Sequence, residues 1–342
     1  MTSSATRLLY LQQAPVQIVL DAYCAQPEWS SEASQDALWR VLSCAAAQRL
    51  SVRYRQRVIK AVVSALAKLH DVELNEALLD AHASAPAGAS ADADEWTTRT
   101  FEPAAGCEVC VRCTDSFGGG AETGCKLWPA ALLLSAWLME TRAELAGLRV
   151  LELGAGPGLP GLSVAAAAEP SRVFLTDFNP PTLSNLQHNV SLLPASAAGR
   201  VRVGSLDWYA PNDGLVGMGE GCEGCGLADL VLAADCIYAP ELVQPLVRTL
   251  RALLGGDTGG DAATRPPSPR RALVASERRS EETWQLFEAA LTTHAFEVHD
   301  LSARAACAAA SRSCGPFWLP ADQLERVVLL ELRAPGAAGE ND

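Results

Sequence analysis

A glycine-rich stretch is the first feature whose residue types and spacing could do chemistry. Residues 150–164 read VLELGAGPGLPGLSV, in which Gly154, Gly156 and Gly158 interrupt an apolar, strand-like run before a helical pattern resumes. Bare backbone between a strand and a helix lets a ligand approach where side chains would collide, and the helix N-terminus adds amide donors. The stretch therefore predicts a binding site for a nucleotide-type cofactor.

Two glycine spacings fit the same letters. Residues 152–158 read as E-x-G-x-G-x-G, and residues 156–161 read as the dinucleotide fingerprint G-x-G-x-x-G. In the second reading Pro157 and Pro160 lie among the amides that would hold a pyrophosphate, and proline has no N–H to donate. The first spacing favours an adenosine cofactor without pyrophosphate, such as S-adenosylmethionine. The second leaves a nicotinamide-dependent oxidoreductase as the alternative.

Polar and aromatic residues follow the later strand-like runs. Asp177 ends the run after the glycine stretch, where a carboxylate can accept both ribose hydroxyls of either cofactor. Trp208 could stack on adenine, although a core tryptophan is the plainer explanation. Asp235 could orient a cofactor amine or an incoming nucleophile, and Tyr238 could line an acceptor channel. Both could instead cap the helix predicted to begin near Pro240.

The elements that must position these residues alternate between strand and helix from residue 149 onward. Helical stretches separate the first five strand candidates, which predicts a doubly wound parallel sheet, an α/β fold. The strand candidates are 149–154, 172–178, 200–208, 229–235, 272–277, 295–303 and 326–334. Since ligands collect at the carboxyl ends of such strands, the polar residues above are expected to lie close together.

The region before the sheet is predicted to hold helices, a linker and a hairpin. Residues 1–82 form an N-terminal helical region, in which Ser34 and Ser51 stand where N-caps are expected. Residues 83–95 are small and polar and predict a linker. A hairpin from residue 96 and a helix that begins at Pro129 then open the catalytic-type domain, residues 96–334. We expect residues 214–228 and 255–271 to be surface inserts and 335–342 a disordered tail.

Charge and cysteine content limit the partners. The 27 Lys and Arg against 40 Asp and Glu give a net charge of -13, which disfavours a chain-wide grip on nucleic acid or anionic lipid. A local basic stripe, Arg53, Arg57 and Lys60, could still touch an acidic partner or RNA. The 11 cysteines, an odd number, suggest reduced thiols in a cytoplasmic protein. The apolar run from Pro129 is shorter than the roughly 20 residues of a membrane span, so we expect a soluble protein.

No metal site is expected. Cys222 and Cys225 have a ligand-like spacing but lack a convincing second pair. The other closely spaced cysteines, Cys107, Cys110 and Cys113, lie in a predicted strand, where three-residue spacing alternates faces.

Five ordered segments together resemble the seven-β-strand protein-lysine methyltransferases, also called methyltransferase family 16. They are TGCKLWPAALLLSAWL, VLELGAGPGLPGL, LTDFNPPTLSNLQHNV, SLDW and AADCIY. The helical segment SVRYRQRVIKAVVSAL from Ser51 is similar to the N-terminal region of members that act on eukaryotic elongation factor 2. Pro129 stands where those members often have an acidic residue. The resemblance implies a Rossmann-like class I methyltransferase, with a seven-stranded sheet, a reversed last strand and S-adenosylmethionine as cofactor.

The resemblance also implies roles for particular residues. Asp235 and Tyr238 match the family's D-x-x-Y signature beside the target amine and are the expected catalytic residues. Apart from the resemblance, Tyr238, Trp128 and either Phe317 or Trp318 could line a channel for the lysine, although core packing is the plainer explanation for Phe317 and Trp318. The expected cofactor-binding residues are Trp128, Glu152, Gly154, Ala155, Gly156, Asp177, Asp207, Trp208 and Ala234.

The resemblance implies a monomeric protein-lysine N-methyltransferase whose first candidate substrate is elongation factor 2. The expected partner is thus a protein, with no membrane and no nucleic acid. Methylation of another protein, of RNA or of a small molecule stays open, as does a non-catalytic adaptor that keeps the fold.

Overall fold

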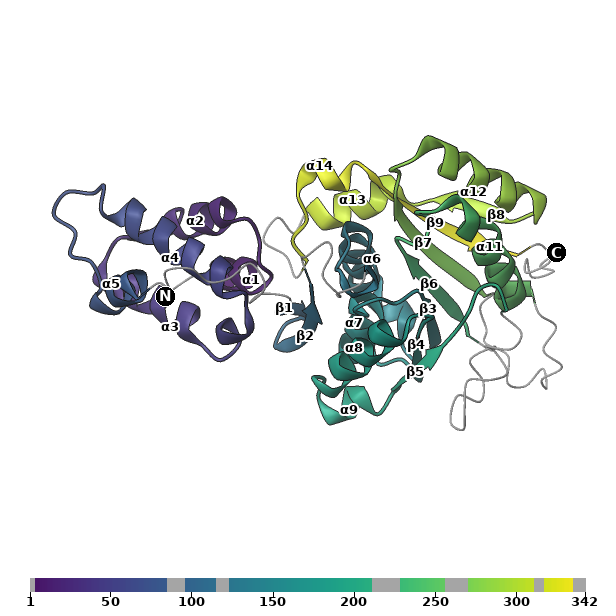
Figure 1. Ribbon diagram of the computed structural model, residues 1–342, viewed down its shortest axis with the longest axis horizontal. Helices are drawn as coiled ribbons and strands as arrows, with labels where there is room; N and C mark the ends of the chain where they lie inside the picture. The colour runs from purple at the N-terminus through teal and green to yellow at the C-terminus, as the bar shows by residue number, and fades with distance from the viewer. Residues whose placement is uncertain are drawn as a thin grey trace.

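The computed structural model of the protein describes residues 4–84, 96–114, 123–210, 228–255, 270–310 and 317–334. Its centre is a seven-stranded sheet with the order β5-β4-β3-β6-β7-β9-β8, flanked by helices on both faces (Figure 1). The strands are β3 (Arg149–Leu153), β4 (Arg172–Asp177), β5 (Val201–Ser205), β6 (Leu230–Ala234), β7 (Arg271–Glu277), β8 (Glu297–Asp300) and β9 (Val327–Arg333). β9 runs antiparallel to both of its neighbours, while the remaining strands share one direction. The predicted doubly wound sheet with a reversed last strand is confirmed.

The strands are apolar at consecutive positions because both faces of the sheet are covered. In β6, Leu230 and Leu232 belong to one core cluster, and Val231 and Ala233 belong to the other. Successive side chains of a strand point to opposite faces, so a strand buried on both faces reads as a continuous apolar run.

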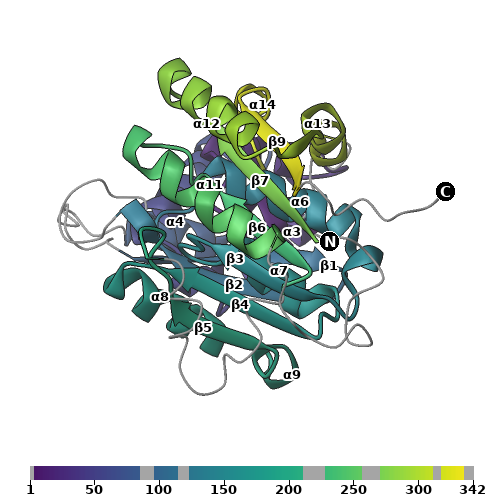
Figure 2. The same cartoon turned by 90° about the vertical axis from the view of Figure 1, so that its right-hand side faces the viewer.

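Helices supply the two cores. The helices and 3-10 turns of this part are η2 (Thr123–Cys125), α6 (Pro129–Glu140), η3 (Arg142–Leu145), α7 (Leu159–Ala167), α8 (Pro180–Ser191), α9 (Ala195–Ala198), α11 (Pro240–Gly255), α12 (Glu281–Thr293), α13 (Ser302–Ala310) and α14 (Ala321–Leu324). α6, α7, α8 and α13 contribute to one core, and α11 and α12 cover the other face of the sheet (Figure 2). α6 begins with Pro129 in its first turn, as predicted, where the missing N–H costs no helical hydrogen bond.

The N-terminal helices form a third core of their own. They are α1 (Ser4–Leu11), α2 (Val16–Cys24), α3 (Glu32–Ser43), η1 (Ala47–Arg49), α4 (Val52–Leu66) and α5 (Glu76–Ala83). Ser51 caps α4 by accepting a hydrogen bond from the Tyr54 amide, as predicted. The prediction that Ser34 is a cap is wrong. Ser31 caps α3, and the Ser34 amide is the donor to its hydroxyl, because Ser34 lies in the first helical turn.

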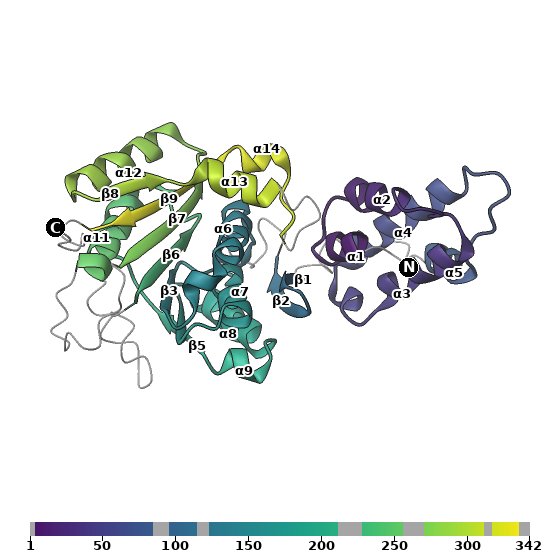
Figure 3. The same cartoon turned by 180° about the vertical axis from the view of Figure 1, so that it is seen from behind.

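A two-stranded hairpin lies between the N-terminal helices and the sheet (Figure 3). It pairs β1 (Thr97–Ala104) with β2 (Cys107–Cys113) in antiparallel fashion, so the predicted hairpin is confirmed. Gln13 Nε2 donates to Thr97 Oγ1 across 2.9 Å, which links α1's C-terminal turn to β1. On the same side, the Trp318 amide donates to Gln12 Oε1 across 2.7 Å. The N-terminal helices are therefore tied to the hairpin and to the segment before α14.

One predicted element differs from the structure. The strand expected over 295–303 is shorter, because Asp300 Oδ1 accepts a hydrogen bond from the Ser302 amide in a turn that leads into α13. The helix expected between β5 and β6 falls mostly on residues 211–227, which lie outside the described residues. Most of the predicted linker and both predicted inserts, and all of the predicted tail, lie outside the described residues. In the described part, no helix has the length and apolar character needed to cross a membrane.

Candidate functional site at the carboxyl edge of the sheet

The glycine loop follows β3 and has a backbone that requires glycine. Gly154 and Gly156 both have a φ of 55°, in the left-handed region. A Cβ on Gly154 would lie 3.1 Å from Cζ2 of Trp208, and a Cβ on Gly156 would lie 2.9 Å from the carbonyl oxygen of Gly124. Residues 123–128, which we call the strap, therefore pack directly on the loop. Ala155, between the two glycines, is buried.

Glu152 lies beneath the loop and has little contact with solvent. Its residue exposure is 1 %, and Oε2 accepts a hydrogen bond from the Gly161 amide across 2.9 Å. Oε1 has no hydrogen-bond partner among the described residues. Burial raises the pKa of Glu152 to about 8, because the charged form loses its hydration. Glu152 therefore orients the first turn of α7 below the expected cofactor site.

Asp177 stands at the end of β4 and faces the glycine loop. Its Oδ2 accepts from the Gly156 amide across 3.2 Å, while Oδ1 accepts from the amides of Phe178 and Asn179. A carboxylate offers about four lone-pair positions and these three amides use three of them, so binding two ribose hydroxyls would require Asp177 to release at least one amide. The backbone bonds hold this carboxylate in place for such a role.

Trp208 and its neighbours line the next strand end. Trp208 is half-buried with its indole against Gly154, and Asp207 Oδ1 accepts from the Tyr209 amide across 2.8 Å. Three aromatic side chains at this edge are strongly exposed: Phe178 and Tyr209 at 64 % and Tyr238 at 58 %. We did not predict Phe178 or Tyr209 as site residues. The signal was available, since each directly follows a predicted site residue at a strand end.

Asp235 follows β6 in an unusual backbone conformation. Its φ is 59°, which is uncommon for a residue with a side chain, and its amide donates to the carbonyl of Ala275 across 2.7 Å. The carboxylate is only 2 % exposed. Arg279 Nη1 and Nη2 donate to Oδ1 and Oδ2 across 3.1 and 2.5 Å, and the Glu277 amide donates to Oδ1. Asp235 is thus paired with a guanidinium.

We missed Arg279 in the sequence, although it connects two predicted site residues. Its Cζ lies 4.7 Å from the ring centroid of Trp128, within range of a cation–π contact, and Lys126 Nζ lies 4.6 Å from the same centroid. Trp128 itself is the residue before α6, and its Nε1 donates to the carbonyl of Thr123. Arg279 therefore joins the strap to the end of β6.

The remaining predicted channel residues differ in position. Tyr238 lies just before α11, and partial burial, followed by nearby Cys236, raises the pKa of its hydroxyl above the ordinary value. Phe317 is buried and stacks on Phe101 of the hairpin, with ring centroids 5.7 Å apart. Trp318 packs on the N-terminal helices. Phe317 and Trp318 are therefore packing residues, and only Tyr238 of these three lies at the carboxyl edge.

The hairpin supports the loop through α8. The Arg112 amide donates to Asn189 Oδ1 across 2.8 Å, and Arg112 Nε donates to Asn185 Oδ1. Asn189 Nδ2 in turn donates to the carbonyl oxygens of Arg112 and of Pro157, the latter across 2.9 Å. Since Pro157 belongs to the glycine-rich stretch, β2, α8 and the loop share one hydrogen-bond network.

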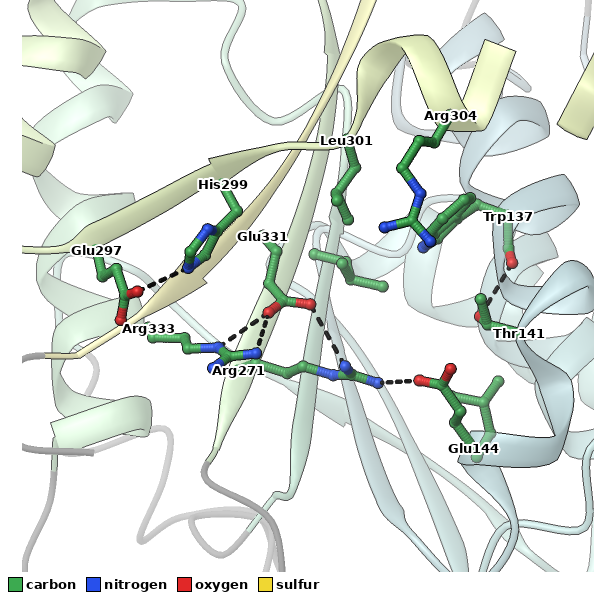
Figure 4. Close-up of a pocket in the computed structure, with 12 residues that line it drawn as sticks. Trp137, Thr141, Glu144, Arg271, Glu297, His299, Leu301, Arg304, Glu331 and Arg333 are labelled. Atoms are coloured by element: carbon green, nitrogen blue, oxygen red, sulfur yellow. Dashed lines mark hydrogen bonds and ion pairs between the residues drawn. The ribbon is translucent and has the colours of Figure 1, made fainter. Parts of the chain in front are cut away.

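A cavity of about 380 Å³ lies at the opposite, amino-terminal end of β7 (Figure 4). Arg271 pairs there with Glu144 and Glu331 at 3.0 and 3.4 Å, and Arg304 stacks over Trp137. None of the predicted site residues lines it. The described residues contain no group of three or more His, Cys, Asp or Glu that could hold a metal ion, and Cys222 and Cys225 lie outside the described part.

Comparison with known proteins identifies the class. Residues 114–290, more than half of the chain, match the lysine methyltransferase family. Human protein-lysine N-methyltransferase EEF2KMT is 32% identical over 174 residues, which cover 48% of each chain. Protein N-lysine methyltransferase METTL21A of Danio rerio is 37% identical over 133 residues, 39% of this chain and 56% of that one. Calmodulin-lysine N-methyltransferase of Arabidopsis thaliana is 29% identical over 136 residues, 40% and 42% of the two chains.

The protein belongs to the lysine methyltransferase family. The matched segment spans about half the length of the EEF2KMT relatives. Membership implies S-adenosylmethionine as the cofactor, and the residues present fit it: a glycine loop that no side chain could occupy, and a carboxylate at the end of β4. The family match favours the glycine spacing over 152–158 and not the dinucleotide spacing.

Proposed function

We propose that the protein transfers methyl groups from S-adenosylmethionine to a lysine side chain of another protein. The observation that carries the proposal is the juxtaposition, at one edge of the sheet, of the glycine loop, an aromatic face and a buried carboxylate. The aromatic face is Trp128 and the carboxylate is Asp235, and Arg279 contacts both. An aromatic face and a carboxylate are the groups that recognise an ammonium ion.

The cofactor would supply a methyl group already activated on a sulfonium. We propose that the loop 154–156 contacts its methionine and ribose parts, with Asp177 accepting from the ribose hydroxyls. Trp208 and Asp207 would lie by the adenine, Trp128 by the methionine end, and Ala234 would contact it through its backbone. Glu152 would support the cofactor site indirectly, because it accepts a hydrogen bond from the Gly161 amide at the start of α7.

The protein's main task in this reaction is alignment. Holding the amine, methyl group and sulfur in line can contribute about 7 to 11 kcal/mol to lowering the barrier. The lysine must also be neutral. Deprotonating a group of pKa about 10.4 near pH 7.4 costs about 4 kcal/mol, and burial of the amine between aromatic side chains reduces that cost. We assign Tyr238 and Trp128 to the channel walls and Asp235 to binding the ammonium form, which must lose its proton before the amine attacks the methyl group.

Elongation factor 2 is our first candidate substrate. Support comes from the EEF2KMT relatives and from the N-terminal helices, which resemble those of members acting on that factor. We propose that residues 1–82 form a docking unit and that residues 96–334 form the methyltransferase domain, joined by the linker 83–95. A monomer that works in the cytoplasm is part of the same proposal.

The test is a labelling experiment. Wild-type protein and the Asp235→Ala variant are incubated with radiolabelled S-adenosylmethionine and a cell extract that has not been methylated beforehand. We expect one labelled band at the size of elongation factor 2 that is lost with the variant. Arg278→Gln is the control, because Arg278 pairs with exposed Glu281 and not with Asp235.

Other outcomes separate the alternatives. Label in a different protein band supports the reaction and overturns the substrate. Label in RNA, or no label although the cofactor binds, overturns the protein-lysine reaction in favour of another acceptor or an adaptor. Failure to bind the cofactor overturns the assignment of the glycine loop.

A further inference from the structure

The groups expected to bind the target ammonium are already in contact with a cation of the protein itself. Arg279 pairs through both of its terminal nitrogens with the two carboxylate oxygens of Asp235. The same guanidinium lies 4.7 Å from the ring centroid of Trp128. Arg279 thus contacts both the carboxylate and the aromatic face, and Lys126 Nζ lies 4.6 Å from the same ring centroid.

An incoming amine cannot reach Asp235 beside Arg279. The Asp235 carboxylate is 2 % exposed, whereas the Arg279 side chain that pairs with it is 35 % exposed. Oδ1 also accepts from the Glu277 amide and approaches the Ser276 hydroxyl at 3.5 Å. The carboxylate has no open side, so a lysine that binds it must first take the position of the guanidinium.

Arg279 has a second carboxylate to which it can move. Glu277 Oε2 lies 2.9 Å from Arg279 Nη2, and the Glu277 side chain is 15 % exposed. Arg279 stands in the connection between β7 and α12, outside any helix or strand. A rotation of its side chain toward Glu277 would keep the guanidinium paired while it uncovers Asp235.

We infer that the Arg279 guanidinium occupies the subsite of the target ammonium and is displaced from Asp235 and Trp128 when a lysine enters. The inference rests on the proposed function and adds a source of specificity to it. A lysine that belongs to a docked protein brings binding energy from remote contacts, which can drive this displacement. A free lysine or a short peptide lacks those contacts, so Arg279 excludes it from the site.

The charges around the subsite are consistent with such an exchange. Among the described residues, Asp235 and Glu277 are the carboxylates that pair with Arg279, and Arg326 reaches Glu277 only at 3.9 Å with a side chain that is 59 % exposed. When an ammonium replaces the guanidinium at Asp235, the group gains one cation and the number of carboxylates stays the same. No carboxylate is left without a cation.

The test is binding of an ammonium probe, which requires no methyl transfer. n-Butylammonium, the side-chain analogue of lysine, is titrated into the full chain and followed by ligand-observed NMR, with wild type, Arg279→Gln and Arg278→Gln compared. We expect Arg279→Gln to bind the probe at least tenfold more tightly than wild type, and Arg278→Gln to equal wild type. The gain should disappear when Asp235→Asn is added to Arg279→Gln. Equal or weaker binding by folded Arg279→Gln overturns the inference.

A second variant covers a failure of Arg279→Gln to fold. Arg279→Lys keeps a cation beside Asp235 but cannot make two parallel hydrogen bonds, so it should bind the probe with an affinity above that of wild type. No gain in folded Arg279→Lys overturns the inference. A gain in probe binding without any labelled protein in extract refutes the proposed reaction and leaves the role of Arg279 intact. Labelled protein without a gain in probe binding refutes the role of Arg279 and leaves the proposed reaction intact.

Discussion

Three acidic side chains at the carboxyl edge of the sheet also accept hydrogen bonds from the protein itself. Asp177 accepts from the Gly156 amide, Glu152 accepts from the Gly161 amide, and Asp235 accepts from Arg279. Each of these carboxylates therefore has a partner within the protein in addition to any role toward a ligand. Replacing one of them changes the geometry of the site as well as its charge, so variants at these positions need readouts for both.

Glu152 gives a pH-dependent prediction. Its pKa is raised to about 8 in the folded protein from an ordinary value of 4.5, because it is buried. The folded state then binds more protons than the unfolded state between these values, so the free energy of unfolding should fall as pH rises from 5 to 8. The slope can reach about 1.4 kcal/mol per pH unit. Urea unfolding of wild type and Glu152→Gln at several pH values measures it.

The Glu152→Gln variant cannot lose a proton at this position. Its unfolding free energy should therefore lack this part of the slope, and the difference between the two proteins should grow toward pH 8. Identical pH slopes for the two proteins between pH 5 and 8 would contradict a raised pKa for Glu152 in the folded protein.

At the scale of elements, the glycine loop depends on a helix and a hairpin that are distant in sequence. Asn189 of α8 connects Arg112 of β2 with the carbonyl of Pro157. Asn189 is fully buried, so these hydrogen bonds have no competition from water. The hairpin thereby supports the glycine loop, although it does not belong to the central sheet.

Asn189→Ala should loosen the loop. The substitution leaves the half-buried Arg112 amide and the buried Pro157 carbonyl without this partner, which costs about 1 to 3 kcal/mol for each group that stays unsatisfied. We expect a lower melting temperature and an affinity for S-adenosylmethionine that falls about tenfold, measured by calorimetry. Gln187→Ala, an exposed position on the same helix, is the control. If the Asn189→Ala protein is destabilised but its cofactor affinity is unchanged, the hydrogen-bond network does not contribute to cofactor binding.

At the scale of the whole molecule, the N-terminal helices are attached to the edge of the methyltransferase part through the hairpin. Arg7 of α1 forms ion pairs with Glu102 and Glu108 of the hairpin, in addition to the hydrogen bonds of Gln12 and Gln13. These helices have their own core and leave the basic stripe of α4 exposed. A docking unit outside the catalytic part is consistent with this arrangement.

The basic stripe can be tested by charge reversal. Arg57→Glu, on the exposed face of α4, should lower kcat/KM for the protein substrate several-fold if this stripe meets an acidic surface, because electrostatic complementarity affects mainly the rate of association. The affinity for S-adenosylmethionine should not change. Arg40→Glu, an exposed position on α3, carries the same charge change and is the control. Equal effects of the two variants would argue against a docking role for the stripe.

The sequence alone determined the fold class and brought the candidate site residues to one edge of the sheet, because both depend on local patterns. Apolar runs such as DLVLAAD, separated by helical stretches, are sufficient to predict strands buried on both faces. Parallel strands then bring their carboxyl ends to one edge, so residues that follow them, such as Asp177 and Asp235, meet there without any knowledge of packing. The glycines of the loop carry their own backbone preference.

Only the tertiary structure decided which side chains pair. Arg278 and Arg279 are adjacent residues of the same type, and the sequence does not distinguish them. In the structure Arg279 pairs with Asp235, whereas Arg278 pairs with Glu281. The partnership of Asn189 with Pro157 likewise depends on how α8 packs against the hairpin. Such contacts join positions far apart in the chain, and their geometry depends on the packing of whole elements rather than on any local pattern.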